Sequence, residues 1–151
     1  MKRFLLYFFL LCGFGFAATA QVDLNDAADN IVGKYSGEQS GEPFKVQISK
    51  LKDGGYRGQV IWMKHDCDDE GNKLLDKKNP DKSLRNQPCD RVVLFSGLKY
   101  NADKHCWDGT KIYDPQRGVR AKLKVKFEAD GRLALKGSLL GISETVRWKK
   151  L

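Results

Sequence analysis

The sequence predicts an all-β protein, a small antiparallel up-and-down barrel of about eight strands. Apolar and polar residues alternate along several segments, which is typical of strands with one buried face. Short Asp- and Gly-containing turns separate these segments, and we find no long helical period. Short connections favour antiparallel neighbours, and closure into a barrel removes exposed strand edges. A two-sheet β-sandwich remains the alternative.

The clearest strand covers 119–128, where five apolar residues alternate with Arg120, three lysines and Glu128. The same alternation marks 44–51 and 132–139, whereas 56–63 is rich in β-branched and aromatic residues. Asp130-Gly131 is a typical hairpin turn, because such turns need positive φ angles. The eight strands are expected at 31–36, 44–51, 56–63, 91–95, 105–113, 119–128, 132–139 and 143–150.

The first 20 residues are typical of a cleavable signal peptide. Lys2 and Arg3 precede a short apolar run, and Ala18-Thr19-Ala20 is a small-x-small cleavage site. The run is too short to span a bilayer, which takes about 20 residues. We therefore expect an exported protein, periplasmic or secreted, with no integral membrane segment after cleavage.

The remaining chain is expected to hold a polar lead-in at 21–30 and a single barrel domain at 31–151. The exception to the strand pattern is the polar segment 64–90. A loop of this length without secondary structure is often functional. We expect a monomer.

Removal of Lys2 and Arg3 reduces the formal net charge from +8 to +6. A positive charge favours anionic partners or surfaces, and the strand at 119–128 has one basic face. We predict no nucleic-acid partner, because this face shows no aromatic residues for stacking. The residues favour a simpler interpretation, in which the lysines only keep the sheet soluble.

Cys67, Cys89 and Cys106 remain after cleavage, and export makes one disulfide plausible. Cys67–Cys89 is the preferred pairing, because closing this loop would contribute about 3 kcal/mol. Three free thiols remain the alternative. The histidines and cysteines lack the paired spacing of zinc sites, so we predict neither a metal site nor a cofactor.

Three clusters of residues resemble the bacterial family catalogued as domain of unknown function 2147. These are 76–88 (with Asn79-Pro80-Asp81 and Leu84-Arg85), 107–118 (with Trp107-Asp108-Gly109 and Ile112-Tyr113-Asp114-Pro115) and the ending around Trp148. Gly33-x-Tyr35 and Val60-Ile61-Trp62 add to the resemblance, which covers residues 31 to 151. The resemblance implies an exported bacterial protein and leaves its activity open.

The chain is also similar, more loosely, to lipocalin-like barrels. Such barrels often begin with Gly-x-Trp and place a late arginine against that ring. Gly33-Lys34-Tyr35 and Arg147 would take these places here, with tyrosine in place of tryptophan.

The candidate site lies where the loop at 64–90 meets the turn after Tyr113. Arg85 is its central residue, because a guanidinium can hold a carboxylate with two hydrogen bonds. That carboxylate would come from Asp76, from Asp114 or from a ligand. The candidate ligand-binding residues are Trp62, Asp76, Asn79, Arg85, Trp107, Tyr113 and Asp114. The aromatic members are expected either in the core or on a pocket wall, because a barrel of eight strands is filled or holds one small ligand.

The interpretation that these features favour is an exported, non-catalytic envelope protein that binds a small amphipathic ligand or an anionic envelope component. One alternative is an enzyme with its site on the loop at 64–90, although no nucleophile pattern is present, so no catalytic residue is assigned. The other alternative is a structural or protein-interaction module.

Overall fold

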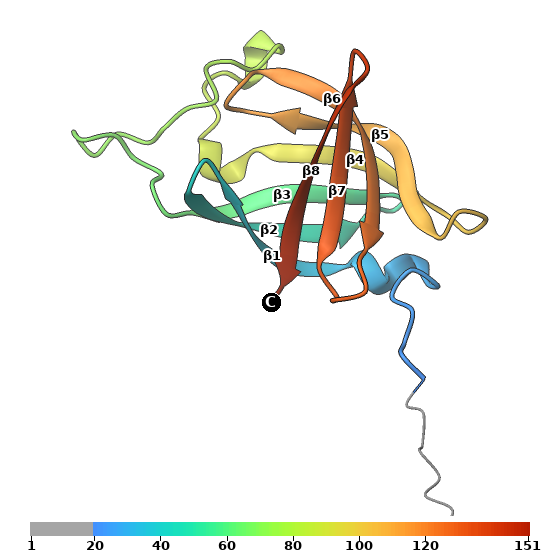
Figure 1. Ribbon diagram of the computed structural model, residues 1–151. Helices are drawn as coiled ribbons and strands as arrows, with labels where there is room; N and C mark the ends of the chain where they lie inside the picture. The colour runs from blue at the N-terminus through green and yellow to red at the C-terminus, as the bar shows by residue number, and fades with distance from the viewer. Residues whose placement is uncertain (1–19) are drawn as a thin grey trace, which may run out of the picture.

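The computed structural model describes residues 20–151, so the predicted signal peptide falls outside the described residues except for Ala20. Eight strands form a closed barrel in which each strand pairs antiparallel with the next (Figure 1). They are β1 (Gly33–Gln39), β2 (Glu42–Lys50), β3 (Tyr56–Met63), β4 (Val93–Asn101), β5 (Cys106–Asp114), β6 (Val119–Phe127), β7 (Leu133–Leu139) and β8 (Ile142–Lys150). The pairing of Tyr35 with Lys150 closes the ring between β1 and β8. The predicted barrel is confirmed, and the sandwich is excluded.

The connections between strands alternate between the two ends of the barrel, because the strands run up and down in order. The β1–β2, β5–β6 and β7–β8 turns lie at one end, together with residues 64–92 between β3 and β4. This long connection contains two short 3-10 helices, η2 (Lys82–Leu84) and η3 (Cys89–Arg91). We call this end the open end. The other end carries the remaining turns and both chain termini of the barrel, and we call it the closed end.

The lead-in seals the closed end. Its 3-10 helix η1 (Ala28–Ile31) lies where the sequence predicts a polar segment before the barrel. The buried Asn25 side chain donates to the Phe127 carbonyl (2.9 Å) and accepts from the Phe127 amide (2.7 Å). The Trp107 indole donates to the Ala28 carbonyl (3.0 Å). These bonds satisfy the polar groups that the lead-in buries where it covers this end of the barrel.

The core fills the closed half. Tyr35 is fully buried and donates its hydroxyl to the Ile31 carbonyl at 2.8 Å. The prediction that Arg147 packs against this ring is wrong, because Arg147 lies on the outer face and pairs with Glu128 at 2.9 Å. Since Tyr35 is the β1 partner of Lys150, the Lys150 ammonium lies over the Tyr35 ring, 5.8 Å from its centroid.

The β4–β5 ladder separates before it reaches the open end. Only Lys99 to Asn101 pair with β5, and the strands part where Gly97 and Gly109 take positive φ angles of 76° and 87°. Glycine adopts such angles without strain, which is why bulges form there. The predicted strand at 91–95 was too short, because the chain passes through Gly97 and remains extended to Asn101.

Candidate functional site

The open half of the barrel is hollow. It contains a cavity of about 1180 Å³ whose walls come from every strand of the barrel and from the long connection. The walls are mainly apolar and include Phe44, Met63, Leu94, Ile112, Leu135 and Trp148. Small side chains enlarge this half, because Ala121 and Gly137 face it on the neighbouring strands β6 and β7. The cavity therefore suits one apolar or amphipathic small molecule.

Polar groups surround the mouth of this cavity. Arg117 binds Glu144 through two hydrogen bonds (2.9 and 3.3 Å), and His65 pairs with Glu42. The Gln39 amide donates to Asp114 at 3.1 Å. An apolar interior with a polar rim matches a molecule that has an apolar body and a polar end.

The long connection docks on the barrel through a buried carboxylate. Asp76 is 2 % exposed and accepts hydrogen bonds from the Tyr113 hydroxyl and from the Asn79 amide, both at 2.7 Å. Asn79 is equally buried and also accepts from the Asp81 amide at 2.9 Å. Neutral donors, rather than a cation, therefore hold this carboxylate in place.

Burial sets the electrostatics of this contact. It raises the pKa of the Tyr113 hydroxyl above its usual range, and the bound Asp76 carboxylate raises it further. The Arg120 guanidinium lies 5.2 Å from the centroid of the Tyr113 ring, an arrangement that favours a cation–π attraction. Tyr113 therefore keeps its proton, and remains a hydrogen-bond donor to Asp76, at alkaline pH values where an ordinary tyrosine would lose it.

A backbone approach fixes the same connection to the β5–β6 turn. Gly118 has a φ of 70°, and a Cβ there would lie 2.5 Å from the Lys78 carbonyl oxygen. The Lys78 ammonium donates to the Gln116 carbonyl at 2.6 Å. The structure therefore brings the loop and the turn together as the sequence predicts, with glycine required where the two backbones meet.

The prediction that Arg85 binds a carboxylate of Asp76 or Asp114 is wrong. Arg85 is exposed, and its Nε donates to the Asn79 carbonyl at 2.8 Å. Asp76 is already satisfied by Tyr113 and Asn79, and Asp114 faces the mouth, where Arg117 lies 3.6 Å away. Arg85 thus stabilises the loop from outside, and the sequence could not show this because Tyr113, which holds Asp76 in its place, comes from a distant segment.

The predicted aromatic residues separate into different places. Trp107 is fully buried in the closed half and belongs to the core, not to the cavity. Trp62 is 43 % exposed on the outer face, with the Lys45 ammonium 5.0 Å from its ring. The reason is a register shift between Lys45 and Val46, which turns Trp62 outward. Tyr113 and Asp114 do line the cavity.

The preferred Cys67–Cys89 disulfide is not formed, and both residues are free thiols, as is Cys106. Leu74 lies between them, because its amide donates to the Asp66 carbonyl and its carbonyl accepts from the Cys89 amide, both at 2.8 Å. The backbone segments on the two sides of Leu74 are therefore two inter-strand spacings apart, roughly 9–10 Å. This separation is beyond the reach of a disulfide. Burial, followed by the charges of Asp76 and Asp90, raises the pKa of the Cys89 thiol.

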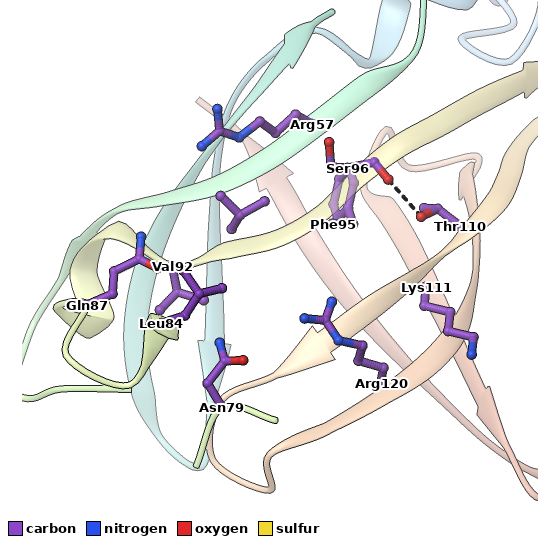
Figure 2. Close-up of a pocket in the computed structure, with 11 residues that line it drawn as sticks. Arg57, Asn79, Leu84, Gln87, Val92, Phe95, Ser96, Thr110, Lys111 and Arg120 are labelled. Atoms are coloured by element: carbon purple, nitrogen blue, oxygen red, sulfur yellow. Dashed lines mark hydrogen bonds between the residues drawn. The ribbon is translucent and has the colours of Figure 1, made fainter. Parts of the chain in front are cut away.

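A second hollow lies on the side of the barrel where β4 and β5 separate. This side cleft has a volume of about 610 Å³ and an apolar floor that includes Val92 and Phe95 (Figure 2). Figure 2 shows the Arg120 guanidinium turned toward this floor, with Asn79 below it and Arg57 on the opposite wall. The Tyr113–Asp76–Asn79 contact separates the cleft from the cavity, since Tyr113 lines the cavity and Asn79 lines the cleft.

The cavity walls are the part of the site that sequence reasoning missed. Residues such as Phe44, Ile112 and Leu135 have the same alternating pattern as core residues. The one available signal was the presence of two small residues, Ala121 and Gly137, on the neighbouring strands β6 and β7, where a Cβ on Gly137 would lie 3.4 Å from the Ala121 Cβ. Among residues 20–151, no three His, Cys, Asp or Glu side chains gather to hold a metal ion. No helix in this part of the chain has the length and hydropathy needed to cross a membrane.

A closed eight-stranded up-and-down barrel, sealed at one end and hollow at the other, defines a lipocalin-like barrel protein. The chain belongs to the bacterial family described as "Uncharacterized protein conserved in bacteria (DUF2147)", whose sequence model matches residues 33–150. The resemblance to this family that the sequence motifs indicate is thereby confirmed.

The chain is similar to a solved structure described as "Protein HP1028 from the human pathogen Helicobacter pylori belongs to the lipocalin family". The sequence identity is 27 % and the TM-score is 0.62, and the match covers 80 % of this chain and 82 % of the other. No curated protein sequence shows significant similarity to the chain.

Proposed function

We propose that this protein is an exported, non-catalytic binding protein of the bacterial envelope that carries one small amphipathic molecule in its barrel. The observation that supports this most directly is the cavity of about 1180 Å³ with apolar walls. The similarity to a protein of the lipocalin family supports the same class of function. Export rests on the predicted signal peptide.

The shape of the cavity indicates how the ligand would lie. Core side chains close its inner end, and the rim carries charged side chains on both sides of the opening. The apolar part of the ligand would therefore enter first, and its polar end would remain at the rim. Lys64 and Lys77 are rim cations with no ion pair among the described residues, so a carboxylate is a suitable polar end.

The test is a fluorescence titration with cis-parinaric acid, whose emission rises in an apolar site. We expect saturable binding to the mature protein and loss of binding in Ala121→Trp. Ala121 lies on the cavity wall, opposite Ile112 in the β5–β6 ladder, so an indole there would fill the cavity.

The matched control is Ala134→Trp, which also adds an indole but does so on β7 at a position outside the cavity lining. Thermal unfolding of both variants checks that the barrel remains folded. Equal binding by wild type and Ala121→Trp, with both folded, would place the probe elsewhere and reject the cavity as the site.

A further inference from the structure

The outer face of β5, β6 and β7 carries a patch of exposed lysines. Lys122, Lys124 and Lys126 alternate along β6 with the buried Leu123 and Val125, so they share the outer face. Lys111 of β5 lies directly opposite Lys122, and Lys136 of β7 lies directly opposite Lys124. We call these five residues the lysine face: Lys111, Lys122, Lys124, Lys126 and Lys136.

The lysine face is not neutralised within the protein. Across the described residues, none of the five ammonium groups forms an ion pair or a side-chain hydrogen bond. Directly opposed like charges destabilise an antiparallel sheet. Two acids near this face pair with arginines instead, Glu128 with Arg147 and Arg132, and Glu144 with Arg117. The charge arrangement therefore favours an external anion.

The composition of the face indicates which kind of anion. Protein–protein interfaces are depleted in lysine and depend on buried aromatic or arginine anchors. Binders of single-stranded nucleic acid add aromatic side chains for stacking, and no aromatic residue lies among these lysines. Lysines without such anchors match the headgroups of an anionic bilayer. Each lysine near such a surface contributes separately to binding.

The adjacent hairpin supplies an apolar anchor. β7 continues from Lys136 into the β7–β8 turn, where Leu140 is 94 % exposed and Ile142 is 72 % exposed. This hairpin projects as a free tip at the open end (Figure 1). Basic residues next to exposed apolar ones are the two signals that together hold a protein at a membrane surface.

We propose that the protein docks on an anionic lipid bilayer through the lysine face, with the tip of the β7–β8 hairpin inserted among the lipids. The contact places the mouth of the cavity beside the bilayer, because Leu139 and Ile142 line that mouth. Docking does not require the cavity to hold a ligand, so it can be tested separately.

The test is co-sedimentation of the mature protein with vesicles of phosphatidylcholine containing phosphatidylglycerol. Each lysine near an anionic surface strengthens binding about fivefold, so Lys122→Gln/Lys124→Gln/Lys136→Gln should weaken it on the order of a hundredfold. Raising the salt from about 0.1 M to 1 M should release the wild-type protein, because the Debye length falls from ~10 to ~3 Å. Leu140→Asn should weaken binding roughly tenfold, since it removes one inserted side chain.

Two matched controls make the same changes in net charge and in polarity as the test variants, but at other places on the surface. Lys34→Gln/Lys45→Gln/Lys52→Gln removes three exposed lysines from β1, β2 and the turn that follows β2. Val22→Asn removes a 75 % exposed apolar side chain at the closed end. Both controls should bind vesicles like wild type, and thermal unfolding should show that all variants are folded.

The proposal is overturned if the two lysine variants lose binding equally, since only net charge would then matter. It is also overturned if vesicles of pure phosphatidylcholine bind as well, or if soluble polyglutamate binds as tightly as the vesicles and thereby indicates an acidic protein partner. Titration with cis-parinaric acid without vesicles separates the two functions. Lysine variants should keep that binding, and Ala121→Trp should keep docking.

Discussion

Removal of one hydroxyl should show how strongly the buried carboxylate holds the long connection to the barrel. Tyr113→Phe keeps the ring under Arg120 but removes one of two side-chain donors to Asp76. A hydrogen bond to a charged group contributes about 1.5–3 kcal/mol, and here the acceptor stays buried. We therefore expect the free energy of unfolding to fall by about 2 kcal/mol, which for a domain of this size lowers Tm by roughly 6–10 °C.

The assay is urea unfolding followed by fluorescence, with thermal unfolding as a second measurement. Tyr100→Phe is the matched control, because that hydroxyl donates at the same distance of 2.7 Å to a neutral acceptor, the Asn25 carbonyl. It should cost about 1 kcal/mol. A loss in Tyr113→Phe no larger than in Tyr100→Phe would refute the reasoning, since the charge of Asp76 would then add nothing.

Two further predictions follow from the cysteines and the tyrosines. Denatured mature protein without reductant should react at three thiols, because Leu74 separates Cys67 from Cys89, and a count of one would mean that these two are joined after all. Unfolding free energy should fall as the pH rises above about 10, because Tyr35, Tyr56 and Tyr113 have raised pKa values in the fold and keep protons that the unfolded chain releases. Urea unfolding at about pH 8 and about pH 11 measures this change in the free energy of unfolding. The change should be smaller in Tyr35→Phe/Tyr113→Phe. An equal free energy of unfolding of the wild-type protein at the two pH values would contradict the prediction.

Local sequence determined the barrel, because each strand and turn is encoded by neighbouring residues. The alternation at 119–128 corresponds to β6, and Asp130-Gly131 forms the next turn with a Gly131 φ of 81°. The meeting of the long loop with the turn after Tyr113 was also predicted. These features depend on a period of two residues and on the conformational freedom of glycine.

Only the tertiary structure decided which side chains meet and where the barrel is empty. Arg85 and Asp76 are close in sequence, yet Asp76 is held by Tyr113, which lies 37 residues away. Trp62 follows the strand pattern, yet a register shift turns it outward. Core and cavity walls share one alternating pattern because every inward-facing residue must be apolar or small. Whether the inward-facing residues fill the barrel depends on the summed size of side chains from different strands, and no single segment of the sequence contains that sum.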